Sequence, residues 1–220
     1  YVVVDNCYGE FVEDIEPTAL GADLVVGSLI KNPGGGMAEV GGYIAGRARA
    51  VELASYRLTS VGTGTEVGAT MGMTKSFYKG LFYAPHTVSQ ALKTAHFAAY
   101  IFEKLGYTVE PRWCEKRSDI IQQILTGSAD GLIAFCGGLQ AGSPIDSFVV
   151  PMPWAMPGYQ DEVIMAAGAF TQGSSIEISA DGPLKPPYTA YLQGGLTYES
   201  GKIAILSAAD AMLKLKEKEV

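Results

Sequence analysis

The chain has 220 residues, of which 48% are hydrophobic and 18% are charged, and its formal net charge is −7. This composition is typical of a folded globular protein and excludes a disordered chain. Acidic and basic residues are interspersed, so the surface offers no basic footprint for nucleic acid or an anionic membrane.

The cysteines and histidines argue against a disulfide framework and against a zinc site. The three cysteines, Cys7, Cys114 and Cys136, are odd in number and form no closely spaced pair, which is typical of a cytoplasmic protein. His86 and His96 lie apart from any cysteine pair, so we expect no metal site. No apolar run approaches the roughly 20 residues that cross a bilayer.

The start of the chain predicts two short buried strands, each followed by a chemically active residue. Residues 1–4 are a β-branched run that ends at Asp5, and residues 21–31 form a second apolar strand that leads to Lys31. The proline and three glycines within residues 32–36 then predict a loop.

The rest of the pattern alternates between helices and strands. Pro85 suits the first turn of a long helix, and Gly106 suits its C-terminal cap. Short strands flanking helical segments favour an α/β sheet covered on both faces, followed by an α+β unit. The predicted elements are strands over 41–46, 107–113, 131–136, 165–170 and 175–179, and helices over 47–57, 84–105, 117–125 and 204–216.

Asp5 and Lys31 form a pair that suits pyridoxal phosphate (PLP). Ligands of open α/β sheets bind at the carboxyl ends of strands, so both side chains face one crevice if their strands are neighbours. A lysine amine forms a Schiff base with the PLP aldehyde, and an aspartate keeps the ring nitrogen protonated. Burial should lower the pKa of such a lysine. The spacing alone also fits a lysine on the surface. The glycine-rich tract equally fits a phosphate loop for a nucleotide, although the GxxxxGK[ST] order is missing.

The segments Val-Asp-Asn-Cys-Tyr-Gly-Glu and Gly-Ala-Asp-Leu-Val-Val-Gly-Ser-Leu-Ile-Lys-Asn-Pro-Gly-Gly-Gly carry a resemblance. They resemble fold-type I PLP-dependent enzymes, in particular the aluminium-resistance or methionine gamma-lyase family, which is related to cystathionine lyases and synthases. The resemblance implies that Lys31 forms the internal aldimine, that Asp5 holds the ring nitrogen, and that Ser28 binds the phosphate. Ile30 departs from the wider group, which has a threonine there, so one phosphate ligand must come from elsewhere.

The resemblance also implies a domain organisation. Residues 1–85 would be the second half of the PLP-binding large domain, and residues 86–220 a linking helix and a small C-terminal α+β domain. The chain therefore looks like the C-terminal half of a family member. On this reading it is a carbon–sulfur lyase for sulfur-containing amino acids that assembles as a homodimer or homotetramer. The alternatives are a PLP aminotransferase or other PLP amino-acid enzyme, or a truncated non-catalytic folding or dimerisation module.

The substrate carboxylate needs a cationic partner. We expect Lys185, in a loop rich in proline and tyrosine, to be this ligand. The alternatives are five arginines, and three tyrosines are candidates for stacking or proton donation. These residues are Arg47, Arg49, Arg57, Arg112 and Arg117, and Tyr8, Tyr159 and Tyr188.

Overall fold

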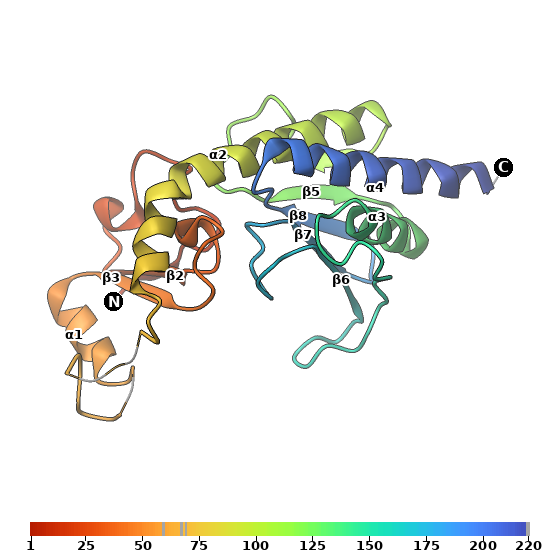
Figure 1. Ribbon diagram of the computed structural model, residues 1–220. Coiled ribbons are helices and arrows are strands. Elements are labelled where there is room, and N and C mark those ends of the chain that lie inside the picture. Colours follow the sequence, from red (N-terminus) through yellow and green to blue (C-terminus); the bar gives the residue numbers. More distant parts are fainter. Residues whose placement is uncertain (59, 67, 69, 219–220) are drawn as a thin grey trace.

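The computed structural model describes residues 1–58, 60–66, 68 and 70–218, so the last two residues of the predicted second domain lie outside the described part. The fold is mixed α/β and contains two separate sheets, which lie near opposite ends of a long helix (Figure 1). Within the described residues, no helix combines the length and apolarity that a membrane crossing requires.

The first sheet has three strands in the order β1-β2-β3. β1 and β2 are parallel, whereas β2 and β3 are antiparallel. Short 3-10 turns follow β1 and β2, and a helix follows β3. The elements are β1 (Val3–Asp5), η1 (Pro17–Leu20), β2 (Leu24–Ser28), η2 (Asn32–Gly34), β3 (Gly42–Gly46) and α1 (Ala48–Ser55). The three predicted strands and the first predicted helix are therefore confirmed.

The second sheet is antiparallel, with the strand order β4-β5-β8-β7-β6. Three helices pack on one of its faces and enclose the main core, which includes Phe102, Phe135, Ile164, Leu192 and Ile205. Figure 1 shows α4 beside the distal part of α2 above these strands. The elements are α2 (Thr74–Lys104), β4 (Thr108–Glu110), β5 (Gln122–Leu125), α3 (Ala129–Ala141), β6 (Val163–Ala167), β7 (Ser179–Pro183), β8 (Thr189–Gln193) and α4 (Tyr198–Lys218).

Helix α2 begins ten residues earlier than the sequence predicts, and Pro85 lies inside it. The extra turns are stabilised by packing, because Gly80 and Ala84 are buried against the loop after Lys31. A proline inside a helix removes one backbone hydrogen bond and bends the axis. The helix indeed changes direction along its course in Figure 1.

Two predicted elements in the second half of the chain are wrong. Residues 117–125 contain no helix: the Asp119 side chain accepts the N–H of Ile121 at 2.8 Å, and β5 then pairs with strands on both sides. Residues 131–136 belong to helix α3 and not to a strand, because Ser128 caps its N-terminus by accepting the N–H of Gly131 at 3.0 Å.

The predicted strands over 165–170 and 175–179 are each displaced from the observed ones. Residues 175–177 form turns, and β7 begins only at Ser179. The cause is the buried Glu177 carboxylate, which accepts the backbone N–H groups of Phe170 at 2.5 Å and Thr171 at 3.2 Å. Strand β8 was absent from the sequence prediction.

Candidate active site

Asp5 and Lys31 follow two strands that are neighbours in the first sheet. β1 pairs with β2 in parallel, with Asp5 opposite Val26, and Lys31 lies just beyond the end of β2. Parallel neighbours place both residues at the same carboxyl edge of the sheet. The adjacency of the two strands is therefore confirmed, while the chemical roles of the two side chains stay predictions.

The Asp5 carboxylate is held by the residue two positions further on. The backbone N–H of Cys7 donates to Asp5 Oδ1 at 3.0 Å, which closes a short turn. Hydrogen bonds from the Cys7 side chain and backbone lower the pKa of Asp5, and the positive charge of Lys31 lowers it further, against a smaller opposing effect of burial. The carboxylate therefore stays ionised at neutral pH, the form that can pair with a cationic ring nitrogen.

The Lys31 amine is half-buried and lies over the ring of Tyr8, with Nζ 4.5 Å from the ring centroid. Burial lowers the pKa of Lys31, but the charges and hydrogen bonds of Tyr8 and Cys7 outweigh it, so the net pKa is raised and the lowering that the sequence predicts is not found. The amine thus carries a proton at neutral pH and must lose it before it can act as a nucleophile.

Tyr8 is held beneath this amine by a strained backbone. Its φ is 77°, a region that bulky side chains rarely adopt. The Tyr8 hydroxyl lies 2.9 Å from Ser175 Oγ, and its carbonyl accepts the N–H of Ile120 at 3.2 Å. Strain of this kind clusters at functional sites. Sequence reasoning named Tyr8 only as one of three tyrosines, because a positive φ leaves no mark on a tyrosine in the sequence.

The glycine loop after Lys31 packs against a helix and does not form an anion cradle. The amides of Gly34 and Gly35 donate to the carbonyls of Lys31 and Asn32, each at 3.1 Å. A Cβ at Gly35 would lie 2.5 Å from the carbonyl oxygen of Gly80 in α2. These glycines therefore allow close backbone packing, and their two amides are not available to a phosphate.

Ser28, the predicted phosphate ligand, ends β2. Its Oγ accepts the N–H of Ile30 at 3.4 Å, the long end of the range for such bonds. Because one weak bond leaves most of its hydrogen-bonding capacity free, Ser28 can still serve an anion. That role stays a prediction.

The Lys31 amine borders a cavity of about 200 Å³ between the first sheet and the second. One wall is the segment 169–175. It is linked to the loop that contains Lys31 (residues 29–36, called the lysine loop), because Ser174 Oγ donates to the carbonyl of Ile30 at 2.7 Å. The opposite wall is the face of the second sheet that carries Asp181 and Gln193. Sequence reasoning missed both walls. Segment 169–175 lies between β6 and β7, whose predicted positions were displaced, and Gln193 belongs to β8, which was not predicted.

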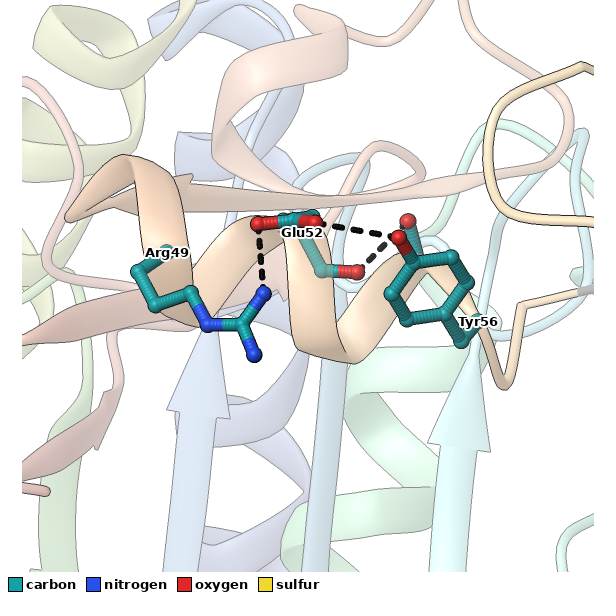
Figure 2. A network of polar contacts seen from close by, with 4 residues as sticks. Arg49, Glu52 and Tyr56 are labelled. Atoms are coloured by element: carbon teal, nitrogen blue, oxygen red, sulfur yellow. Dashed lines mark hydrogen bonds and ion pairs between the residues drawn. The ribbon is translucent and has the colours of Figure 1, made fainter. Parts of the chain in front are cut away.

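Lys185, the expected carboxylate ligand, does not line this cavity. Its amine pairs with Asp161 at 3.2 Å. The candidate arginines do not line it either. Figure 2 shows one of them: on helix α1, Arg49 donates to Glu52 at 2.8 Å, and the Tyr56 hydroxyl donates to the same carboxylate at 3.0 Å.

Arg117 is buried, but its contacts belong to its own segment. Its guanidinium donates to the carbonyl of Ile121 at 3.1 Å and to the side-chain oxygen of Gln122. Burial lowers the pKa of Arg117 to about 10. These bonds hold the chain as it enters β5, so they explain the burial of Arg117 without a substrate.

Comparison with known sequences gives one consistent result. The sequence model described as methionine gamma-lyase matches residues 1–213. The Bacillus subtilis protein YnbB is 56% identical over 213 residues, which cover 97% of this chain and 51% of YnbB.

Two solved structures extend the likeness to the fold. A Clostridium novyi carbon-sulfur lyase involved in aluminum resistance is 57% identical, with a TM-score of 0.89, and the match covers 94% of this chain and 48% of that one. A Listeria innocua protein described as a candidate cystathionine beta-lyase involved in aluminum resistance is 54% identical, with a TM-score of 0.90, over 95% and 51% of the two chains. The chain thus spans about half the length of these relatives.

Proposed function

Since the chain belongs to the methionine gamma-lyase family, we propose that it carries the amine and the acid of a PLP-dependent carbon–sulfur lyase for sulfur-containing amino acids. The observation that carries this proposal is the position of Asp5 and Lys31 at the same carboxyl edge of two paired parallel strands. We further propose that the chain adopts the fold-type I arrangement, with the site between the two sheets.

The side chains present fit PLP in part. An ionised carboxylate and an amine at one sheet edge match the ring nitrogen and the aldehyde of the cofactor. The amides of Gly34 and Gly35 do not match its phosphate, because they are bonded within the loop. We therefore propose that Ser28 is one phosphate ligand and that the others lie outside residues 32–36.

When bound, PLP supplies an electron sink for the bond that breaks at the substrate α-carbon. Asp5 supplies a fixed negative charge at the ring nitrogen. Lys31 would hold the cofactor through its side-chain amine and would accept or donate a proton at that nitrogen. The Tyr8 ring holds that amine in place, and its hydroxyl, bonded to Ser175, keeps the ring oriented.

Reductive trapping tests the proposal. The purified chain is incubated with PLP, reduced with borohydride, digested and mapped by mass spectrometry. We expect the label to concentrate on Lys31, to be lost in Lys31→Ala and to weaken in Asp5→Asn. The exposed Lys75 gives a matched control, because Lys75→Ala should leave the label on Lys31 unchanged. A label spread evenly over the exposed lysines would contradict the proposal.

The reaction itself is read from its products. A carbon–sulfur lyase releases a keto acid, ammonia and a thiol without any amino acceptor. An aminotransferase needs an acceptor and releases no thiol. Assays for thiol and ammonia, made on protein that PLP labels at Lys31, therefore separate the two reactions.

A further inference from the structure

The cavity beside Lys31 has a second charged wall. In the second sheet, Asp181 of β7 lies opposite Met165 of β6, and Ser179 lies opposite both Ala167 and Gln193. Alternate residues of a strand share a face, so these side chains line one surface. The opposite face of the same strands is buried under the helices. Asp181 therefore faces the cavity and not the core.

Most polar groups of the cavity are already engaged. Ser174 bonds Ile30 and Ser175 bonds Tyr8, as described above. Ser179 Oγ donates to Gln193 Oε1 at 2.6 Å, and Gln193 Nε2 donates to the carbonyl of Tyr191 at 3.1 Å. The carboxylate of Asp181 retains acceptor capacity, and it is the one acidic group among the residues that line the cavity.

Asp181 is a half-buried acid without an ion-pair partner in the described part of the chain. Burial raises its pKa, and the neighbouring Gln193 amide and the charge of Lys31 oppose that rise. Among the residues that line the cavity, only Asp181 and Lys31 are charged. A partly desolvated carboxylate is costly unless a cation approaches it, and a neutral methyl group placed there would add to the cost.

We propose that Asp181 selects ligands whose side chain ends in a protonated amine over ligands whose side chain ends in a methyl group. Met165, Ala167 and Ala169 give the cavity an apolar surface that suits a thioether stem leading to that amine. The inference rests on the proposed function for one point only, that the α-amino acid end of the ligand lies at Lys31. It separates methionine-like substrates, which end in a methyl group, from thioethers that carry a distal ammonium.

Two isosteric probes test this selection. S-(2-aminoethyl)cysteine and S-propylcysteine differ only in a terminal ammonium or methyl group. Their dissociation constants are measured by calorimetry on the purified 220-residue chain, without cofactor. We expect the cationic probe to bind about tenfold more tightly, the effect of one half-buried ion pair. Equal affinities, or no binding of either probe, would overturn the proposal.

Variants assign the preference to Asp181. Asp181→Asn keeps the shape of the side chain and should bring the ratio of affinities close to one. Asp161→Asn is the matched control, since Asp161 lies outside the cavity and pairs with Lys185. It should leave the ratio unchanged. Lys31→Ala removes the competing cation and should increase the ratio. A preference that survives in Asp181→Asn would refute the assignment.

The outcome is separable from that of the proposed function. The calorimetric ratio requires neither PLP nor turnover, whereas the trapping experiment requires no substrate. A cation preference that depends on Asp181, without PLP attachment at Lys31, would support this inference and reject the lyase. PLP attachment at Lys31 without any cation preference would support the proposed lyase and reject the selection by Asp181.

Discussion

The Ser174 hydroxyl donates a 2.7 Å hydrogen bond to the carbonyl of Ile30, the residue that precedes Lys31. The bond joins positions 144 residues apart. The next residue, Ser175, bonds the Tyr8 hydroxyl, whose ring lies under the Lys31 amine. Two consecutive serines of the segment 169–175 therefore fasten both the backbone and the ring that position the lysine.

Ser174→Ala should lower the free energy of unfolding by about 1 kcal/mol, because it leaves the partly buried carbonyl of Ile30 without its partner. Urea denaturation measures the change. The exposed Ser147 provides the control, and Ser147→Ala should shift stability by less than about 0.5 kcal/mol. Equal effects of the two substitutions would contradict a role for the bond.

Gly80→Ala should destabilise the protein although alanine is the better helix former. A Cβ at Gly80 would lie 2.2 Å from the carbonyl oxygen of Gly34, so the lysine loop must shift at a cost of about 1–3 kcal/mol. Among the described residues beyond its own stretch of helix α3, no atom lies within 4 Å of a Cβ added at Gly137, so Gly137→Ala should stabilise by up to about 1 kcal/mol. In thermal denaturation, Gly80→Ala should lower the midpoint temperature and Gly137→Ala should raise it. A higher midpoint temperature in Gly80→Ala would show that the loop packs elsewhere.

Glu177→Gln should lower the free energy of unfolding by about 1–3 kcal/mol. The two oxygens of the buried carboxylate each accept one backbone N–H group, and glutamine replaces one of these oxygens with an NH2 group that cannot accept. The amides of Phe170 and Thr171 should then exchange hydrogen faster than in the native protein. Glu39 is exposed, and Glu39→Gln should change neither stability nor exchange. Unaltered exchange at Phe170 in the Glu177 variant would mean that the loop holds without this carboxylate.

Glu10→Gln should become more stabilising, relative to the native protein, as the pH rises. Burial raises the pKa of Glu10 above 4.5, and its Oε2 has no partner among the described residues. Between 4.5 and the raised pKa, the unfolded chain has lost a proton that the folded protein keeps, so the native protein loses stability with increasing pH. The glutamine side chain of the variant has no such proton to lose. The difference between the two unfolding free energies, measured from about pH 4 to about pH 8, should therefore grow, and a flat difference would reject the prediction.

The sequence predicted the first sheet well because each strand there lies in a short apolar run bounded by glycine or an acid. The parallel pairing that brings Asp5 and Lys31 to one edge needed only the rule for strand ends. The predicted roles of Asp5, Ser28 and Lys31 came from a resemblance, and the trapping experiment is their test.

The second sheet was harder to predict because tertiary contacts decide its elements. Gln122 and Gln123 are neither β-branched nor aromatic, yet both pair with β8, and Gln123 also pairs with β4. Glu177 accepts the backbone N–H groups of Phe170 and Thr171, and residues 175–177 form turns where the sequence predicted a strand. Asp181 became visible as a cavity residue only once β7 had its register, so the second charged wall could not be read from the sequence.

The N-terminal turns of helix α2 contact the loop after Lys31, and its C-terminal half contacts α4 and the residues just before α4. The two halves have different partners, since Gly80 meets Gly34 and Gly35, and Thr94 is closely approached by Gly195 and Gly201. A chimera of two homologous chains joined inside residues 74–104 would therefore combine a helix end with a partner to which it did not adapt. Crossover points for recombination should lie outside this helix, which must be inherited together with the loop it supports.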